Sequence, residues 1–470
     1  MSRIFLDVTD LAIYLRHNSG VSGIQRVLIN VARMMAETQS DVFISFVDPT
    51  TKAYRAVSAK SLDDINGFEE AILKQLFFIK GRASKALATK KLPTLEKYRP
   101  GSAKYYYRFA CAVWASFRGK DDYFRRRGTS LSAWRTALKT GPSDTKGVSI
   151  PASVDPLNTA EPGDTLVILG ASWNISRLDA YARQLREKHV RLVVLLHDLV
   201  PLLTPEHVED RVAKNFRLWL EDTVSQADMI LATTEFTAAK LRDYLASHDS
   251  EAKVEVLPLA RCFEPSVTDE TAKDRVDLLS PIDRRIAGLI TRPYVLCVGT
   301  MESRKNNLSL AQAWHRLSLR PEIDLPRLIF AGKRGWLNDD FFELMDRTSG
   351  LGGWAKIVEG PSDAELALLY EHCLFTTMVS FHEGWGLPIG EGFTYGKTAV
   401  IAKNSAMPEV GGELVEYCDA QSVSSIAAAC ERLISDHDHR GALEDKIAAA
   451  KLRSWSDVAE DLTALLQNKL

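Results

Sequence analysis

Seven residues separate two glutamates, Glu383 and Glu391, in the segment SFHEGWGLPIGEGF. Carboxylates accept hydrogen bonds from hydroxyl groups, so this pair suits the recognition of a sugar or a ribose. We expect Glu383 in a loop and Glu391 in the first turn of the helix that follows. The two carboxylates would then bracket one ligand instead of pairing with each other.

The start of that helix is a second chemical feature of the segment. Pro388 suits the first helical position, where no backbone N–H is needed. The free backbone amides near Gly386 and Leu387, together with the helix dipole, favour an anion. The segment therefore predicts a site for a ligand that carries both hydroxyl groups and negative charge.

The elements that position this segment are short apolar strands that alternate with amphipathic stretches. Runs such as LVVLL and YVLCVG lack apolar–polar alternation, which is typical of parallel strands buried on both faces. Strands that alternate with helices predict a doubly wound α/β arrangement, and two sets of roughly six predict two sheets in tandem. The expected strands are 4–8, 42–48, 165–170, 192–197, 229–233, 254–259, 294–299, 327–331, 356–359, 374–380, 398–402 and 415–418.

The domain organisation follows from the length and from one charged stretch. A chain of 470 residues exceeds what one ordinary core holds, which favours two domains. The charged stretch 269–292 lies between the two sets of strands. We therefore expect an N-terminal domain over 1–280 and a C-terminal domain over 281–470.

The bulk composition is that of a soluble globular protein, with 46% apolar residues, 26% charged residues and a formal net charge of −2. The six cysteines form no C-x-x-C pair and lack zinc-ligand spacing to a histidine, which indicates buried thiols in a reducing compartment. Asp7, Asp10 and Arg16 interrupt the first apolar stretch, so we expect no signal peptide. No run approaches the ~18 apolar residues of a spanning helix. We expect a cytoplasmic protein without a metal site or cofactor.

The stretch 71–140 departs from this rhythm. It contains 17 Lys or Arg against three acidic residues, a net charge of +14 that leaves −16 for the rest of the chain. Interleaved aromatic residues suit contact with anionic lipid at the inner face of a membrane; a solvated helical insertion is the alternative. Such mixtures also suit nucleic acid, but no RNA- or DNA-binding motif accompanies this one, so we expect no nucleic-acid partner.

The motifs, read in order along the chain, resemble those of glycosyltransferase family 4, the retaining glycosyltransferases of GT-B fold. Glu383 and Glu391 match the family's E-x7-E signature. Further resemblances lie at 20–28 (GVSGIQRVL), 195–206 (LLHDLVPLLTPE), 298–307 (VGTMESRKNN), 330–336 (FAGKRGW), 361–370 (PSDAELALLY), 405–413 (SAMPEVGGE) and 454–462 (SWSDVAEDL). The resemblance implies two Rossmann-like domains with parallel sheets facing across a cleft. It also implies a last helix, near 454–470, that crosses back to pack on the first domain.

The resemblance implies roles for the residues of the donor site. Glu391 would bind the ribose hydroxyls, and Glu383 would contact the hydroxyls or the reacting face of the transferred sugar. The backbone along the sugar and the phosphates would come from Gly384, Trp385, Gly386, Leu387 and Pro388.

Two donor-side residues keep a second interpretation. Trp385 would form a wall of the donor pocket or pack between the domains. Lys333, in AGKRGW, would approach the nucleotide or stand as an ordinary surface lysine.

Arg304 and Lys305 are the cations that the resemblance places on the donor diphosphate. The bidentate guanidinium of Arg304 and the point charge of Lys305 can stabilise the leaving diphosphate without a metal. Asp436-His437-Asp438 matches the metal-binding D-x-D pattern but lies in a late charged stretch, and we interpret it as solvated surface. Many family members have an arginine directly after the glycine of the phosphate strand; here the residue is Thr300, which places more weight on Arg304 and Lys305.

The first domain is expected to contribute the remaining site residues. His197 follows a buried strand and would reach towards the donor sugar; a histidine satisfied within its own loop is the alternative. Gly20 and Gly23 allow close backbone approach to the acceptor or the diphosphate. Arg26, early in the next helix, is a weaker member of this group.

The resemblance implies transfer of a hexose from a nucleotide-diphosphate sugar with retention of anomeric configuration. The variants SRKN and GKRGW resemble those of mannosyl- and related hexosyltransferases of bacterial polysaccharide assembly, so GDP-mannose is the preferred donor. The expected acceptor is a saccharide, polyprenyl-diphosphate-linked if the basic stretch serves a membrane, as in capsule or O-antigen synthesis. The alternatives are a catalytically silent scaffold of a polysaccharide machine and a nucleotide-sugar epimerase or a phosphorylase on the same fold.

Overall fold

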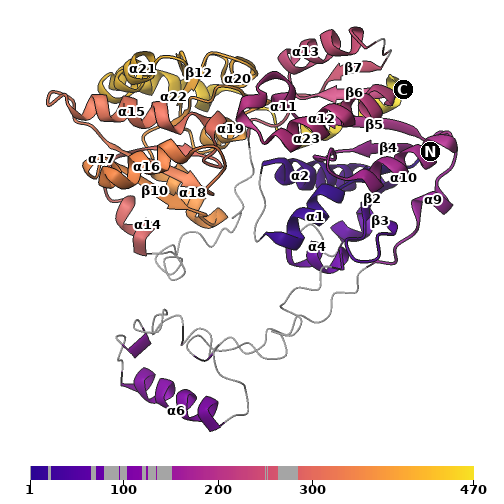
Figure 1. Cartoon of the computed structure of the whole chain (residues 1–470), viewed down its shortest axis with the longest axis horizontal. Helices are drawn as coiled ribbons and strands as arrows, with labels where there is room; N and C mark the ends of the chain where they lie inside the picture. Colours follow the sequence, from indigo (N-terminus) through magenta and orange to yellow (C-terminus); the bar gives the residue numbers. More distant parts are fainter. Residues whose placement is uncertain are drawn as a thin grey trace. The chain divides into compact units, whose positions relative to one another are not determined.

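The computed structural model describes residues 2–18, 23–64, 70–78, 95, 103–118, 123–124, 134, 151–248, 250, 252–262 and 284–469. Two sheets organise most of these residues, and helices pack around each sheet (Figure 1). All the strands predicted from the sequence are present, with ends that differ by a few residues.

The first sheet has seven strands in the described residues, in the order β3-β2-β1-β4-β5-β6-β7. Neighbouring strands run parallel from β2 to β7, which is the doubly wound arrangement that the alternation of strands and helices predicts. The strands are β1 (Ile4–Asp7), β2 (Val42–Val47), β3 (Tyr54–Ser58), β4 (Thr165–Ile168), β5 (Arg191–Leu196), β6 (Met229–Ala232) and β7 (Lys253–Val256).

Strand β3 was not predicted from the sequence. It pairs antiparallel with β2 through a short connection, in the register Val47 opposite Tyr54. The connection bends at Lys52, which has a φ of 65°. The only sequence signals for β3 are the turn residues of DPTTK and the short apolar–polar alternation Tyr54-Arg55-Ala56.

The second sheet has six parallel strands in the order β10-β9-β8-β11-β12-β13, counted over the described residues. Strands β8 and β11 are neighbours, so the loops that follow them meet at one edge of the sheet. The strands are β8 (Tyr294–Val298), β9 (Arg327–Gly332), β10 (Ala355–Glu359), β11 (Thr376–Met378), β12 (Ala399–Ala402) and β13 (Glu416–Cys418).

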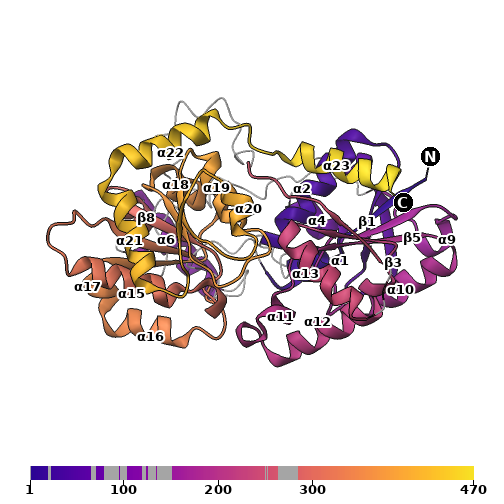
Figure 2. The same ribbon diagram turned by 90° about the horizontal axis from the view of Figure 1, so that it is seen from above.

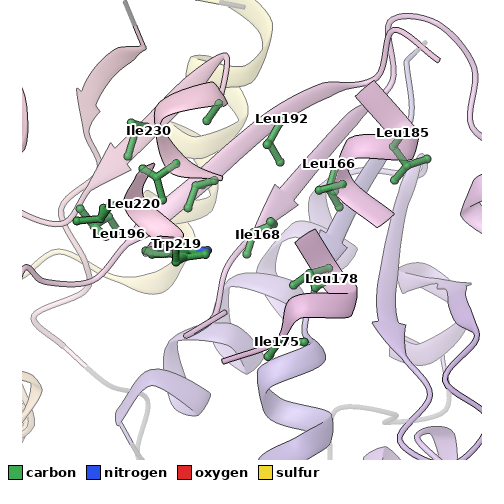
Figure 3. Packing of buried hydrophobic residues seen from close by; sticks show 14 of the residues in the cluster. Leu166, Ile168, Ile175, Leu178, Leu185, Leu192, Leu196, Trp219, Leu220 and Ile230 are labelled. Carbon is green, nitrogen blue, oxygen red and sulfur yellow. The ribbon is translucent and has the colours of Figure 1, made fainter. Parts of the chain in front are cut away.

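The apolar runs explain why these strands lie in the interior. In β4 all four side chains are buried, and those of β5 are buried after Arg191. Alternate residues, such as Leu166 and Ile168, join one core cluster with Leu178 and Leu220 from the flanking helices (Figure 3). The intervening residues are buried as well, which is the pattern of strands covered on both faces.

Helices follow nearly every strand. In the first half they are α1 (Thr9–His17), α2 (Gly23–Thr38), α3 (Ala59–Asp63), α9 (Pro156–Thr159), α10 (Ser176–Glu187), α11 (Val200–Leu203), α12 (Asp210–Asp222) and α13 (Glu235–Ala246). In the second half they are α14 (Arg284–Leu289), α15 (Asn307–Ser318), α16 (Asp339–Arg347), α17 (Ser349–Gly352), α18 (Asp363–His372), α19 (Leu387–Thr394), α20 (Met407–Gly411), α21 (Val423–Ser435), α22 (His437–Ala449) and α23 (Trp455–Asn468).

The last helix, α23, packs on α2 of the first half (Figure 2). Its start is fixed by a capping box in which Ser454 and Asp457 each accept from the other's backbone amide. Gln39, just beyond α2, donates to the Thr463 hydroxyl at 2.5 Å. The chain therefore returns to the first sheet at its end, as the resemblance implies.

The domain boundary between 280 and 281 falls outside the described residues and stays a prediction. Residues 69–150 and 269–283 belong to a second unit, of which the structure describes only part. Its described helices are α4 (Glu70–Leu76) and α6 (Ala103–Phe117). Most of the predicted basic insertion 71–140 thus lies outside the described residues, and no helix among those described is long and apolar enough to cross a bilayer.

Candidate active site

The two loops that meet beside β8 and β11 carry the predicted cations and one predicted carboxylate. After β8 the chain forms a short 3-10 helix, η5 (Ser303–Lys305), which presents Arg304 and Lys305. After β11 it forms the loop that holds Glu383 and then α19. Ligands of open α/β sheets bind at this carboxyl edge, so the topology assembles a candidate site.

Glu383 is the centre of this cluster. Its Oε2 lies 2.8 Å from Arg304 Nη1, and its Oε1 lies 2.6 Å from Lys305 Nζ. Ser380 also donates its hydroxyl to Oε1, at 2.6 Å. The residue is 6% exposed, so these ion pairs form away from bulk water, where charge interactions are strong.

The ionisation of Glu383 follows from these partners. Burial alone would raise the pKa of its carboxyl, but the charges of Arg304 and Lys305 outweigh burial and lower the pKa to about 2. Glu383 is therefore a carboxylate at neutral pH. It accepts hydrogen bonds and cannot act as a general acid.

Arg304 and Lys305 differ in how many protein groups their side-chain N–H donors contact. Arg304 also donates to Glu302 at 2.6 Å and to the backbone oxygen of His382, so its guanidinium braces both loops. Lys305 lies against Gly299 and lines a small cavity with Thr300 and neighbouring residues. An ammonium has three N–H donors, so Lys305 can hold Glu383 and an anion at the same time.

Asn306 fixes the turn that presents these cations, and the sequence analysis did not single it out. It has a φ of 58°, in the left-handed region that asparagine tolerates better than most residues. Its buried amide donates to the backbone oxygens of Val379 and Ala420, at 3.0 and 2.9 Å. The run SRKNN contained a signal for it, because asparagine is typical of such turns.

Gly384 brings the loop of Glu383 against the loop of His197. A Cβ on Gly384 would lie 2.1 Å from the backbone oxygen of His197, so only glycine fits at this approach. The Thr233 hydroxyl joins the two segments, 3.0 Å from the His197 oxygen and 2.9 Å from the Gly384 oxygen. The structure thus places these two predicted site residues side by side.

The imidazole of His197 is buried and bonded within the first half of the chain. Its Nε2 lies 2.7 Å from the Leu169 backbone oxygen, which can only accept, so Nε2 carries the proton. Burial lowers the pKa of His197, which keeps the ring neutral at neutral pH. Nδ1 is then the ring nitrogen left for a ligand.

Glu391 has its own partners and does not pair with Glu383. Arg26 Nη1 lies 2.6 Å from Glu391 Oε1, and the Tyr370 hydroxyl donates to Oε2 at 2.6 Å. Arg26 also pairs with Asp363. The two glutamates therefore have separate partners, and the bracketing of one ligand stays a prediction. A ribose at Glu391 would replace Arg26 or share the carboxylate with it.

The start of α19 differs from the expectation in two details. The helix begins at Leu387, so Pro388 is its second residue, and Glu391 lies beyond the first turn. The predictions of Pro388 at the first position and of Glu391 in the first turn were therefore wrong. The reason is Gly386, whose φ of 100° allows the chain to enter the helix directly after it.

The remaining predicted residues contact protein groups. Trp385 donates its Nε1–H to the Ala260 oxygen at 3.3 Å, as in the packing alternative. Lys333 donates to the Tyr14 hydroxyl at 2.9 Å. Gly23 is the first residue of α2, where an added Cβ would lie 3.4 Å from Leu387, whereas Gly20 lies outside the described residues.

Tyr370 was not singled out in the sequence analysis, because nothing in the chain relates it to its partner Glu391, which lies 21 residues further along. The D-x-D match Asp436-His437-Asp438 lies at the start of α22. Its first residue, Asp436, caps this helix by accepting a hydrogen bond from the His439 backbone amide at 2.9 Å. In the part of the chain that the structure describes, no three His, Cys, Asp or Glu side chains converge as a metal site would require.

Comparison with known proteins gives sequence relatives that are named mannosyltransferases. The chain is 29% identical to O-antigen chain mannosyltransferase B of Escherichia coli over 272 residues, which are 57% of this chain and 68% of the relative. It is 24% identical to the serotype-specific mannosyltransferase WbdA of Escherichia coli over 241 residues, 51% of this chain but only 29% of WbdA.

Solved structures share the fold over nearly the whole chain. The sucrose-phosphate synthase of Thermosynechococcus elongatus superposes with a TM-score of 0.56 at 15% identity, over 100% of this chain and 99% of that one. Anabaena HepE in complex with UDP-glucose superposes with a TM-score of 0.55 at 14% identity, over 99% of both chains. The predicted GT-B fold is thereby confirmed.

Residues 281–450 match the family described as glycosyl transferases group 1, and this range contains Arg304, Lys305, Glu383 and Glu391. The resemblance found in the sequence is therefore confirmed at the level of a group 1 glycosyltransferase domain, and the assignment to family 4 stays a prediction. The chain is a glycosyltransferase of GT-B fold with a group 1 glycosyltransferase domain.

Proposed function

We propose that this glycosyltransferase moves a hexose from a nucleotide-diphosphate sugar to a saccharide acceptor, with retention of anomeric configuration. The observation that carries the proposal is the cluster that the half-buried Arg304 and Lys305 form around the buried Glu383 at the carboxyl edge of the second sheet. It combines cations for a diphosphate with a carboxylate for sugar hydroxyls. The proposal includes the division into an acceptor-side domain over 1–280 and a donor-side domain over 281–470.

The diphosphate would be held by charge and by backbone amides. Lys305 supplies a point charge beside Gly299 and Thr300, and Arg304 holds the loop that carries Glu383. The amide of Leu387 begins α19, where the helix dipole favours negative charge. These groups stabilise the charge that develops on the leaving phosphate.

The hydroxyl groups of the donor would be read by the two carboxylates. Glu383 is ionised, so it accepts hydrogen bonds from the transferred hexose. Glu391, oriented by Tyr370, accepts from the ribose in place of Arg26. His197 lies beside Gly384 and would face the same sugar.

The reaction step needs no protein nucleophile. The bond between the anomeric carbon and the leaving phosphate oxygen breaks, and a bond to the acceptor oxygen forms on the same face. The acceptor proton passes to the leaving phosphate oxygen. The diphosphate leaves with its charge held by Lys305 and Arg304, so the protein acts by positioning and electrostatics.

The names of the relatives support a proposal for the sugar and the acceptor. Both are named mannosyltransferases, one of them of the O-antigen chain. We therefore propose GDP-mannose as the donor and a saccharide of a cell-surface polysaccharide, carried on a lipid, as the acceptor. The enzyme would work in the cytoplasm, at the inner face of the membrane.

A transfer assay tests the proposal. The full chain is incubated with excess chelator, one sugar donor and one acceptor. The donors are GDP-mannose, UDP-glucose, UDP-galactose and dTDP-rhamnose, and the acceptors are octyl mannoside, octyl glucoside and octyl galactoside. We expect transfer from GDP-mannose, unchanged by chelator, and an α-linked product by NMR. A β-linked product from GDP-mannose, which is an α-linked donor, would refute retention. Isomerisation of the donor without transfer would favour an epimerase. No reaction with any pair of donor and acceptor would favour a catalytically silent scaffold.

A further inference from the structure

Helix α6 of the second unit has two different faces. On one face Ala112 and Ala115 are buried in a small cluster with Phe124 and Trp134. The opposite face is exposed, although most of its side chains are apolar or aromatic. Tyr106 is 63% exposed, Tyr107 66%, Val113 41% and Trp114 54%.

These side chains form one continuous stripe, which we call the aromatic face of α6: Tyr106, Tyr107, Ala110, Val113 and Trp114. At 100° per residue they span roughly 120° of the helix circumference. Cations lie at its border: Lys104 and Arg118 are exposed, and the Arg118 guanidinium lies 4.2 Å from the centre of the Trp114 ring. The aromatic face contains no acidic residue.

A helix of this kind is unusual on a protein that faces water alone. Contiguous exposed apolar patches mark surfaces that contact another phase or another molecule. Tyrosine and tryptophan have an apolar body and a polar tip, and they concentrate where apolar and aqueous phases meet.

We propose that the aromatic face of α6 docks on the surface of a bilayer that contains anionic lipid. Its rings would enter the head-group region, and Lys104 and Arg118 would pair with lipid phosphates. The inference deepens the proposed function, because it names the surface that would bring the enzyme to a lipid-borne acceptor. It rests on the proposed function for that role alone, and the docking itself is independent of it.

Charge complementarity favours this partner. The stretch 71–140, which contains α6, has a net charge of +14, and the rest of the chain has −16. An anionic surface therefore attracts the stretch that carries the aromatic face and repels the remainder. Such attraction reaches only about a Debye length, ~10 Å at 0.1 M salt, so it orients the chain at close range.

Vesicle co-sedimentation of the full chain tests the inference without any substrate. We expect binding to vesicles of equal parts phosphatidylglycerol and phosphatidylcholine at low salt. Binding should be weak to phosphatidylcholine alone and should weaken on the order of tenfold at about 0.5 M salt. The triple variant Tyr106→Ser, Tyr107→Ser, Trp114→Ser should bind at least about tenfold more weakly.

The matched control is Leu319→Ser, which removes an apolar side chain that is 69% exposed outside the second unit. It should bind vesicles like the parent, and Lys104→Gln with Arg118→Gln should lose the preference for anionic lipid. As a second measurement, brominated lipid should quench the parent's tryptophan fluorescence more than that of Trp114→Tyr. Equal quenching, or equal binding by the parent and the triple variant, would overturn the inference.

Two further outcomes separate this inference from the proposed function. If the parent does not bind vesicles at low salt but transfers mannose to a soluble acceptor, the membrane inference fails and the proposed function stands. Transfer to the soluble octyl glycoside should be the same for the triple variant and the parent, because that acceptor needs no membrane.

Discussion

Replacement of Lys305 by alanine should lower kcat/KM for the sugar donor by about 10²- to 10³-fold. This is the typical loss when one preorganised donor to a developing negative charge is removed. Lys305 fits that description because it lies against the glycine after β8 and lines the small cavity at the edge of the sheet. The measurement is the rate of nucleoside diphosphate release with saturating acceptor and varied donor.

The matched control for Lys305 is Lys356→Ala, which removes the same charge from an exposed position in β10. We expect its kcat/KM to stay within about twofold of the parent, since exposed charges contribute little. Lys305→Arg should recover part of the loss, because it restores the charge with a different shape. Equal activity of Lys305→Ala and Lys356→Ala would remove Lys305 from the reaction.

Glu383→Gln should reduce activity by at least about 10²-fold and should also destabilise the fold. The change removes the charged carboxylate from the half-buried Lys305 and Arg304, and we take about 3 kcal/mol, the lower end of the cost of breaking a buried pair. For a domain of this size, 3 kcal/mol corresponds to a fall in Tm of roughly 6–12 °C. The control is Glu359→Gln at an exposed position of β10, for which we expect a change in Tm of less than about 2 °C.

The pH dependence of Tm isolates the ion pairs of Glu383. Its pKa falls from the ordinary 4.5 to about 2 in the folded chain, so the carboxylate stabilises the native state. This contribution is complete above pH 4.5 and is lost as the pH falls through the folded pKa. It amounts to about 3 kcal/mol by linkage. Below pH 4.5 the difference in Tm between the parent and Glu383→Gln should shrink; a difference that stays constant to pH 2 would contradict the ion pairs.

The strands could be predicted because burial on both faces leaves a strong mark in the sequence. Runs such as LVVLL exclude polar residues at every position, and the structure finds them in β5 and in its neighbours. Strand β3 was missed because it lies at the sheet edge, where Arg55 and Ser58 are only half-buried and interrupt the apolar run. Edge strands are harder to predict because their partly exposed side chains interrupt the apolar run.

The sequence could identify residues of the candidate site but not the contacts between their side chains. The resemblance placed Lys305 and Glu383 on one donor, and the structure shows that the loops after the neighbouring strands β8 and β11 bring them together. Parallel topology does not dictate which side chains pair. The partnerships of Glu391 with Arg26 and Tyr370 depend on helix packing and rotamers, which no spacing in the chain encodes. The start of α19 likewise depended on the left-handed Gly386.

The central claim is that the Lys305–Glu383 cluster binds the diphosphate of a nucleotide sugar without a metal. The most direct test is the shift in Tm of the parent, Lys305→Ala and Lys356→Ala with GDP, UDP, ADP, dTDP or CMP, each with excess chelator. At ~100 times its Kd, a ligand adds about 2.7 kcal/mol to the native state. We predict a rise of several degrees with GDP in the parent and in Lys356→Ala, and its loss in Lys305→Ala. A shift that requires metal, or one that survives in Lys305→Ala, would contradict the claim.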